Sequence, residues 1–252
     1  MKKQRIDELM VESGFSDSLK NAQALIMSGI VLVNEQRVDK PSETFSSEAI
    51  IRIKGETEKH RYVGRGGLKL ERALETFHMQ SNECVCLDVG ASTGGFTDCL
   101  LQNGAKKVVA VDVGTNQIVW KLRNDKRVEV RENTNARYLK PEDFTEKFDL
   151  IVMDVSFISV TKIFPALLPL LQNDGKIISL IKPQFEVEKG EVGKGGIVRE
   201  TEKHEKVLKR VNEIAEQIGL IVIGLIESPI LGADGNKEFL VLYEKRKENR
   251  IC

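Results

Sequence analysis

The pattern of hydrophobic and polar residues predicts two units of different size, separated by an aperiodic polar stretch that begins at residue 54. In the first part, residues 5–13 and 18–28 carry apolar side chains at helical intervals. The stretch IVLVNEQRV, residues 30–38, predicts two short strands joined by a tight turn, and EAIIRIK, residues 48–54, predicts a further strand. These elements together predict a small α+β unit.

From residue 84 onward, short apolar segments alternate with amphipathic ones, which indicates an α/β domain. The predicted strands lie near residues 84–88, 107–112, 128–131, 148–154, 175–181, 221–226 and 238–243. A predicted helix near residues 68–77 precedes the first of these strands. Further helices are predicted near residues 95–103, 116–123, 158–171 and 201–218. Regular alternation of this kind is typical of a mostly parallel, Rossmann-like sheet with helices on both faces.

The polar, aperiodic stretch that begins at Lys54 marks the boundary between the two units. We therefore place the first domain at residues 1–59, the linker at 60–64 and the second domain at 65–252. A length of 252 residues suits one large domain with a small appended one.

Composition excludes several classes of protein and leaves nucleic-acid binding to local features. The chain has 38 Lys+Arg and 38 Asp+Glu residues, so any RNA-binding surface must come from clustering of charge. It has no apolar run near ~18 residues and no signal-peptide pattern, so we expect a cytoplasmic protein without a membrane partner. Four cysteines without a Cys-x-x-Cys pair, and three histidines, predict no metal site.

The turn after the first long strand, LDVGASTGGF, resembles a nucleotide-binding turn but has unusual glycine spacing. A dinucleotide-binding turn needs glycine at the position of Ser92, where the backbone approaches a diphosphate. The serine favours a ligand without phosphate, and we predict S-adenosylmethionine rather than a nicotinamide cofactor. Asp88 is expected near its ammonium, Asp112 at its ribose and Asn135 at its adenine. The predicted cofactor-binding residues are Asp88, Gly90, Ser92, Gly94, Gly95, Phe96, Asp112, Val113, Asn135, Ala136 and Asp154.

Four charged residues occur in motifs placed at or near the loops above the same edge of the predicted sheet. They are Lys69 in RGGLKLERAL, Asp154 in LIVMDVSFIS, Lys182 in LIKPQFE and Glu238 in GNKEFLVL. Any one of them could form an ordinary surface ion pair. Four at one ligand-binding edge favour a functional cleft instead.

These motifs resemble those of the TlyA family, the haemolysin A and YqxC-like proteins, whose catalytic domain is similar to FtsJ-type ribose 2′-O-methyltransferases. The first 54 residues or so resemble the alpha-L RNA-binding domain of ribosomal protein S-four. Leu19 stands where that domain commonly has arginine, which leaves Lys20 as the nearest cation, and Glu35 stands where the hairpin turn often has glycine.

The resemblance implies a catalytic tetrad of Lys69, Asp154, Lys182 and Glu238. It also implies methylation of cytidine in ribosomal RNA, with the large subunit as the main target and the small subunit as a second one. A ribose 2′-hydroxyl is a very weak acid, so it needs a base or a field that stabilises the alkoxide. Whether Lys182 removes the proton or steers the oxygen as a cation stays open at this point.

The predicted RNA contacts are Arg5, Lys20, Arg65 and Phe157. Phe157 would either stack on the target base or pack in the core. The glycine-rich stretch 188–200 is predicted to form a mobile loop over the site. The expected partners are ribosomal RNA and ribosomal subunits, with the protein acting as a monomer or weak dimer.

Three other functions remain as alternatives from the sequence. An RNA-binding or ribosome-assembly factor without activity would keep the fold but not the chemistry. A haemolysin is disfavoured because no large basic amphipathic helix is predicted. A methyltransferase for small molecules would leave the first domain without a role.

Overall fold

The computed structural model describes residues 3–12, 15–16, 18–34, 36–46, 49, 51–53, 61–188, 190–232 and 235–246. The predictions made for Glu35, for the polar stretch 54–60 and for residue 189 of the glycine-rich stretch lie outside these residues. The chain divides into two compact units, Met1–His60 and Arg61–Cys252. Residues 61–64, which we predicted as linker, belong to the second unit, where the ring of Tyr62 is buried.

The first unit is a small α+β domain built around a single apolar core. Helix α1 (Ile6–Glu12) packs against α2 (Leu19–Met27), and Ser18 caps α2 by accepting a hydrogen bond from Asn21 N. Strands β2 (Val31–Val33), β3 (Gln36–Arg37) and β5 (Ile51–Ile53) form an antiparallel sheet in the order β3-β2-β5. Two further strands that the apolar pattern did not predict, β1 (Lys3–Arg5) and β4 (Thr44–Ser46), pair with each other.

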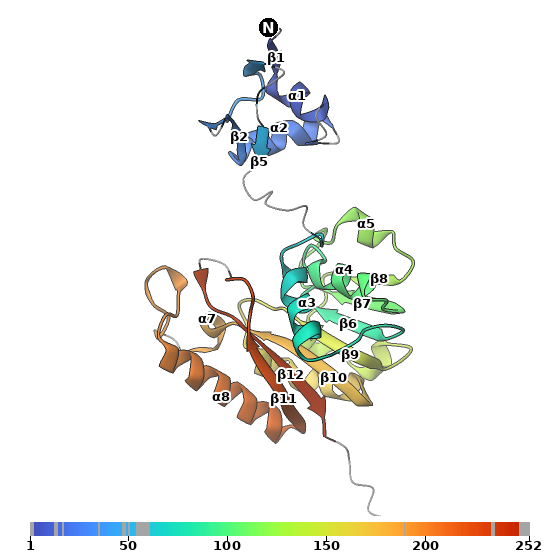
Figure 1. Cartoon of the computed structure of the whole chain (residues 1–252). Coiled ribbons are helices and arrows are strands. Elements are labelled where there is room, and N and C mark those ends of the chain that lie inside the picture. The colour runs from blue at the N-terminus through green and yellow to red at the C-terminus, as the bar shows by residue number, and fades with distance from the viewer. Residues whose placement is uncertain are drawn as a thin grey trace, which may run out of the picture. The chain divides into compact units, whose positions relative to one another are not determined.

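A sheet of seven strands forms the second unit (Figure 1). The strands are β6 (Val85–Val89), β7 (Lys107–Val111), β8 (Val128–Arg131), β9 (Phe148–Met153), β10 (Leu171–Ile181), β11 (Leu220–Glu227) and β12 (Phe239–Lys245). Their order is β11-β12-β10-β9-β6-β7-β8, with β6 to β10 parallel and β12 antiparallel to both of its neighbours. The predicted Rossmann-like, mostly parallel sheet is confirmed.

Helices cover both faces of this sheet and divide the core into two clusters. Helices α3 (Gly66–Thr76), α4 (Gly95–Gln102) and α5 (Trp120–Arg123) pack on one face, and α6 (Phe164–Leu167) and α8 (Thr201–Gln217) pack on the other. Short elements complete the chain: α7 (Pro183–Glu186), η1 (Ala136–Tyr138), η2 (Pro141–Asp143), η3 (Val160–Lys162), η4 (Leu168–Leu170) and η5 (Lys194–Gly196).

The single helix predicted for residues 158–171 is wrong. That stretch forms η3, α6 and η4 in succession, with Pro165 and Pro169 each in the first turn of a new element. Proline has no N–H to donate and its ring clashes with the preceding turn, so an apolar pattern of helical period cannot continue through these two positions.

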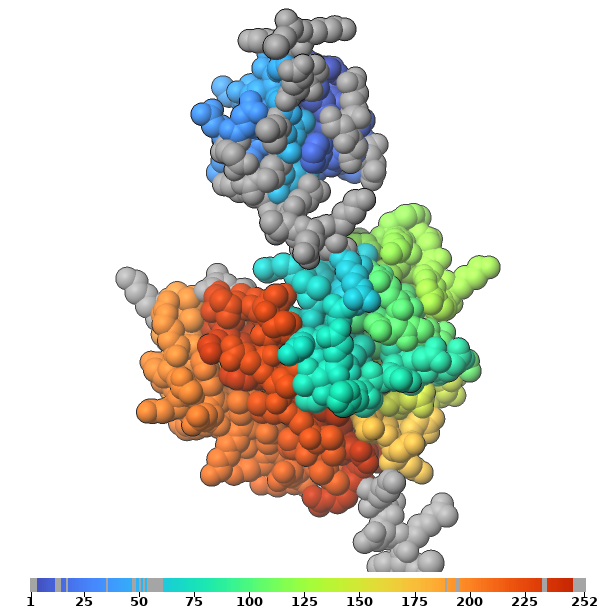
Figure 2. Space-filling model, viewed as in Figure 1, coloured from blue at the N-terminus to red at the C-terminus, as the bar shows by residue number. Residues whose placement is uncertain are grey.

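Helix α3 connects the beginning of the second unit to its last strands. Gly224 in β11 leaves room for the ring of Phe77, which directly follows α3. Figure 2 shows residues of this part of the chain, in cyan, meeting the orange and red residues of the C-terminal strands on the face in view. The contact brings two segments far apart in the sequence to the same side of the sheet.

The ends of β6 and β9 mark where the order of the strands reverses. From β6 the chain proceeds outward to β7 and β8, whereas β9 and β10 lie on the other side of β6. The loops that follow β6 and β9 therefore leave the sheet in opposite directions and open a crevice between them, where ligands bind in folds of this class.

The first turn of α3 provides a test of packing. A methyl group at Gly67 would overlap the buried ring of Tyr62, whereas one at Gly66 would lie 3.5 Å from the nearest atom of Phe96. We expect Gly67→Ala to lower the free energy of unfolding by about 1–3 kcal/mol, because the packed ring must move. Gly66→Ala should be neutral or slightly stabilising, because alanine favours the helix.

Thermal unfolding of the two variants checks this expectation. The Gly67→Ala protein should melt roughly 2–10 °C below the parent, given the usual relation between free energy and melting temperature at this size. Equal melting temperatures for the two variants would contradict the packing derived for Tyr62.

Candidate active site

The turn between β6 and α4 holds its shape through glycines in the left-handed region. Gly90 has φ +85° and Gly94, the N-cap of α4, has φ +101°. A side chain at Gly90 would overlap the carbonyl oxygen of Asp154, at the end of the neighbouring strand β9. Asp154 in turn donates its backbone N–H to Val89 O at 2.9 Å. The turn and the acid at position 154 are therefore in direct backbone contact.

A cavity of about 420 Å³ lies beside this turn. Seven of the predicted cofactor-binding residues line it: Gly90, Ser92, Asp112, Val113, Asn135, Ala136 and Asp154. Asp112 accepts hydrogen bonds from Ser92 N at 2.8 Å and from Gly114 N at 2.7 Å, so its carboxylate is held at the cavity wall. The side-chain oxygen of Asn135 accepts from Arg137 N at 3.1 Å and from Arg137 Nε at 3.3 Å, which fixes this amide group beside the cavity.

The other four predicted cofactor residues do not line the cavity but support it. Gly94 and Gly95 allow close packing, Gly94 against Leu122 and Gly95 against the backbone of Gly64 and Gly67. Phe96 is buried in the core below the turn. These residues shape the turn, and their predicted contacts with the cofactor stay predictions.

Asp88 lies below the turn, with no exposed surface. Its Oδ2 accepts a hydrogen bond of 2.7 Å from the hydroxyl of Thr97 in α4, and its Oδ1 has no hydrogen-bond partner among the described residues. Burial raises the pKa of Asp88 to about 7; the bond from Thr97 opposes this shift and the nearby charge of Asp154 adds to it. The structure thus gives Asp88 a role in anchoring α4 to β6, and its predicted contact with the cofactor's ammonium stays a prediction.

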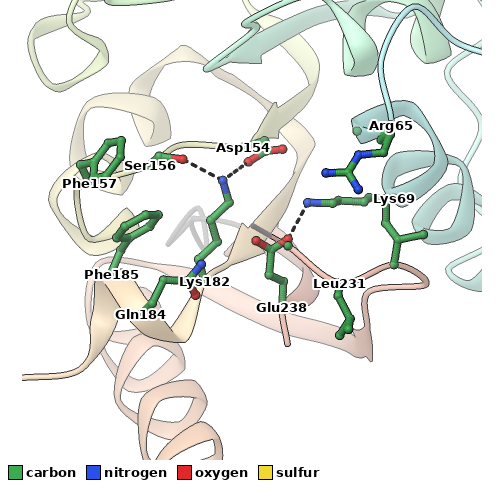
Figure 3. A pocket seen from close by; sticks show the side chains of 13 residues that line it. Arg65, Lys69, Asp154, Ser156, Phe157, Lys182, Gln184, Phe185, Leu231 and Glu238 are labelled. Atoms are coloured by element: carbon green, nitrogen blue, oxygen red, sulfur yellow. Dashed lines mark hydrogen bonds and ion pairs between the residues drawn. The ribbon is translucent and has the colours of Figure 1, made fainter. Parts of the chain in front are cut away.

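A second cavity, of about 320 Å³, adjoins the first (Figure 3). All four members of the predicted tetrad line it, together with Arg65 and Phe157. Asp154, Ser156 and Phe157 line both cavities, so the two spaces share one wall. The two cavities therefore lie side by side at these three residues.

The tetrad forms two ion pairs inside the second cavity. Lys69 Nζ lies 2.5 Å from Glu238 Oε2, and both side chains are almost fully buried. Lys182 Nζ lies 2.6 Å from Asp154 Oδ1, although the angle is not that of a hydrogen bond, and it donates a hydrogen bond of 2.9 Å to Ser156 Oγ. Figure 3 shows Lys182 reaching between Asp154 and Ser156 while Lys69 meets Glu238 from the side of α3.

The segment before β12 fixes the position of Glu238. Asn236 accepts a hydrogen bond from Val198 N and donates one to Gly196 O, both at 3.0 Å. The ring of His204 bonds to Val198 O at 2.9 Å. The described residues of the glycine-rich loop thus pack against the segment that carries Glu238, which differs from the predicted mobile loop over the site.

The predicted RNA contacts lie in both units. Arg65 lines the second cavity and forms no ion pair with any described residue, and Phe157 is 91% exposed at φ +64°. Lys20 is exposed on α2 of the first unit. Arg5 is engaged by Asp7 through hydrogen bonds of 3.0 and 2.7 Å, so a phosphate would have to compete with that carboxylate.

Sequence reasoning missed several residues of the two cavities. Gln117 and Thr134 line the first, Gln184 and Phe185 line the second, and Ser156 lines both. Ser156 and Phe185 each stand within three residues of a tetrad member, and this proximity was the signal available. The identities of serine and phenylalanine alone do not indicate a site, because both are common in loops and cores.

Other chemistry has little support in the described part of the chain. No three His, Cys, Asp or Glu side chains among those residues converge in a way that could hold a metal ion. Cys86 and Cys99 are buried thiols, and burial raises the pKa of each. No helix within the described ranges has both the length and the hydropathy needed to span a membrane.

Comparison with known proteins identifies both units. Residues 62–245 match the FtsJ-like methyltransferase family, and residues 4–51 match the S4 domain. The chain is 49% identical to YqxC of Bacillus subtilis, provisionally named an rRNA methyltransferase, over 95% of this chain and 85% of that protein. It is 41% identical to the 16S/23S rRNA (cytidine-2′-O)-methyltransferase TlyA of Mycobacterium tuberculosis, over 98% of this chain and 92% of that protein. A solved structure from Streptococcus thermophilus, provisionally named a hemolysin, is 46% identical in sequence and has a TM-score of 0.76. The match covers 100% of this chain and 92% of that chain.

The raised pKa of Asp88 predicts a specific pH dependence of stability. The folded state favours the neutral carboxyl, so the contribution is fully present below the unfolded pKa of about 3.9 and is lost as the pH rises through about 7. Relative to Asp88→Asn, the parent should lose at most about 1.4 kcal/mol per pH unit between pH 5 and 7.

Urea unfolding of both proteins from pH 5 to 8 measures this difference, and Asp174→Asn, an exposed carboxylate in β10, serves as the control. The control should track the parent at every pH. Parallel curves for the parent and Asp88→Asn would show that Asp88 is not the titrating group.

Proposed function

Because this chain belongs to the FtsJ-like methyltransferase family, whose members depend on S-adenosylmethionine, we propose that it methylates ribose 2′-hydroxyl groups of ribosomal RNA. The observation that carries the proposal is the shared wall of the two cavities, where Lys182 and Asp154 meet. One cavity would hold the methyl donor and the other the acceptor nucleotide. The S4 domain at the N-terminus would supply additional contacts with RNA.

The first cavity fits S-adenosylmethionine chemically. Ser92 occupies the position where a diphosphate would need glycine, and this cofactor has no phosphate. The carboxylate of Asp112 has lone pairs left to accept from ribose hydroxyls, since each of its oxygens accepts one backbone N–H. The side chain of Asn135 would meet the adenine edge. When bound, the cofactor supplies a methyl group from its sulfonium to the acceptor oxygen.

The second cavity fits a ribose hydroxyl as the acceptor. Lys182 would act on the 2′-hydroxyl, either by taking its proton or by stabilising the alkoxide, and both roles place its Nζ at the wall between the cavities. Asp154 would orient Lys182, and Glu238 would orient Lys69. Alignment of the acceptor oxygen with the donor sulfonium would supply much of the remaining acceleration.

Charge and shape favour an RNA nucleotide over a small neutral acceptor. Among the described residues, three cationic side chains and two carboxylates line the second cavity: Arg65, Lys69 and Lys182, with Asp154 and Glu238. Arg65, which forms no ion pair with a described residue, would suit a phosphate of the target strand. The exposed ring of Phe157, with Phe185 at a centroid distance of 5.0 Å, would stack on the target base.

The proposal is tested by incubating purified protein with labelled S-adenosylmethionine and unmodified large and small ribosomal subunits. Label should enter ribosomal RNA and should protect one linkage per site from alkaline hydrolysis, because a 2′-O-methyl group blocks cleavage there. From the TlyA relatives we expect the methylated nucleotides to be cytidines. Cofactor binding without transfer to either subunit would favour an assembly factor without activity.

Removal of the Lys182 side chain should impair methyl transfer without weakening the binding of S-adenosylmethionine. We expect Lys182→Ala to reduce methyl transfer by about 10³-fold or more while the Kd for S-adenosylmethionine stays within about threefold, because the side chain acts on the acceptor. The assay is single-turnover methyl transfer combined with calorimetric titration. Lys209→Ala, a change of an exposed lysine on α8, should leave both unchanged. Substantial activity in Lys182→Ala would rule out the assigned role.

The proposed contact of Asp112 with the ribose of S-adenosylmethionine should govern affinity for the cofactor. Asp112→Ala removes a charged acceptor and the anchor of the Ser92 amide, so the Kd for S-adenosylmethionine should rise about 10- to 100-fold. Asp112→Asn keeps one acceptor oxygen and should give an intermediate value. Titration of both variants beside Glu75→Ala, an exposed change on α3, checks the order. An unchanged Kd in Asp112→Ala would remove this residue from the cofactor site.

A further inference from the structure

Ser156 occupies a place in the active site that the family tetrad does not explain. Its hydroxyl is the only hydrogen-bond partner of Lys182 Nζ within the described part of the chain, at 2.9 Å. It also lines both cavities, at the wall where methyl donor and acceptor would meet. We propose that Ser156 is a positioning residue that aims Lys182 at the acceptor oxygen. This inference rests on the proposed function.

The geometry of the ammonium group gives the reason. A lysine carries three N–H donors in a fixed tetrahedral arrangement. In Lys182, Ser156 Oγ takes one N–H and Asp154 Oδ1 lies 2.6 Å from Nζ as the second anchor. The hydrogen bond to Ser156 fixes the direction of one N–H, and the ion pair with Asp154 holds Nζ close to the carboxylate. With Asp154 alone, whose contact lacks the angle of a hydrogen bond, Nζ could swing about the carboxylate.

The loop that carries Ser156 is itself fixed at both ends. At its start, Asp154 N donates to Val89 O at 2.9 Å. At its end, the buried carboxylate of Glu186 accepts from Ser159 Oγ at 2.7 Å and from Val160 N at 2.8 Å. Glu186 belongs to α7, the element that directly follows Lys182. The loop that carries Ser156 is thus bonded to the helix that follows Lys182, so the fold itself keeps the serine and the lysine together.

The neutral charge of serine also suits this role. A third carboxylate near Lys182 would cancel the positive charge that a developing alkoxide needs. A hydroxyl holds the ammonium without that effect. Lys182 Nζ also lies 6.0 Å from the ring of Phe185, which offers no hydrogen-bond acceptor. Figure 3 shows the ammonium of Lys182 between Ser156 on one side and Asp154 on the other.

The test compares Ser156→Ala and Ser156→Thr with the parent in steady-state methylation of ribosomal subunits. Ser156→Ala should lower kcat about 10- to 100-fold, as expected for loss of a hydrogen bond to a charged group. KM for RNA and Kd for the cofactor should stay within about twofold. Ser156→Thr keeps the hydroxyl and should recover kcat to within about threefold of the parent. Thr76→Ala, which removes an exposed hydroxyl at the end of α3, should match the parent.

The outcomes separate this inference from the proposed function. An active parent with an equally active Ser156→Ala variant overturns the inference alone. Equal loss in the alanine and threonine variants, or a loss that appears as a weaker cofactor Kd, indicates a packing role and also overturns it. An inactive parent overturns the proposed function, and the inference falls with it.

Discussion

Gly90 and Asp154 approach so closely at the ends of β6 and β9 that no side chain fits between them, and both cavities depend on this approach. The glycine allows the cofactor turn to lie against the backbone of the strand that carries the acid. The backbone bond from Asp154 N to Val89 O fixes the same junction from below. Methyl transfer requires reacting atoms held within about 3–3.5 Å, and a backbone contact holds two sites in register better than side chains alone.

The charges gathered at this junction come at a cost to stability. Lys69 and Glu238 are almost fully buried and lie 169 positions apart in the sequence. Burying an ion pair removes two charges from water, and apolar residues of similar volume often stabilise a fold as well or better. Function therefore explains the two ion pairs better than stability does. Each pair presents a lysine to the second cavity, and a carboxylate contacts each lysine there.

Recognition of RNA has to rest on local features, because the chain as a whole carries no net charge. In the first unit, Arg5 is already bound to Asp7, which limits what that unit can offer a phosphate. In the second unit, Arg65 and the exposed Phe157 line the second cavity, where we propose that the acceptor nucleotide binds. Two modest contacts joined in one chain bind with higher affinity than either one alone, since the second association becomes intramolecular.

The sequence by itself determined the strands of the second unit, since its central strands are buried on both faces and appear as apolar runs, and it selected the four charged residues by their motifs. It could not give the order of the strands, on which the contact between Gly90 and Asp154 depends. It also could not give the packing of α4 that buries Asp88, whose predicted contact with the cofactor stays a prediction, and it overlooked Ser156. Local patterns report which residues prefer the interior or a turn. Burial of one acid and the meeting of a serine with a lysine 26 positions away arise only when the sheet assembles, because they depend on neighbours brought by other strands.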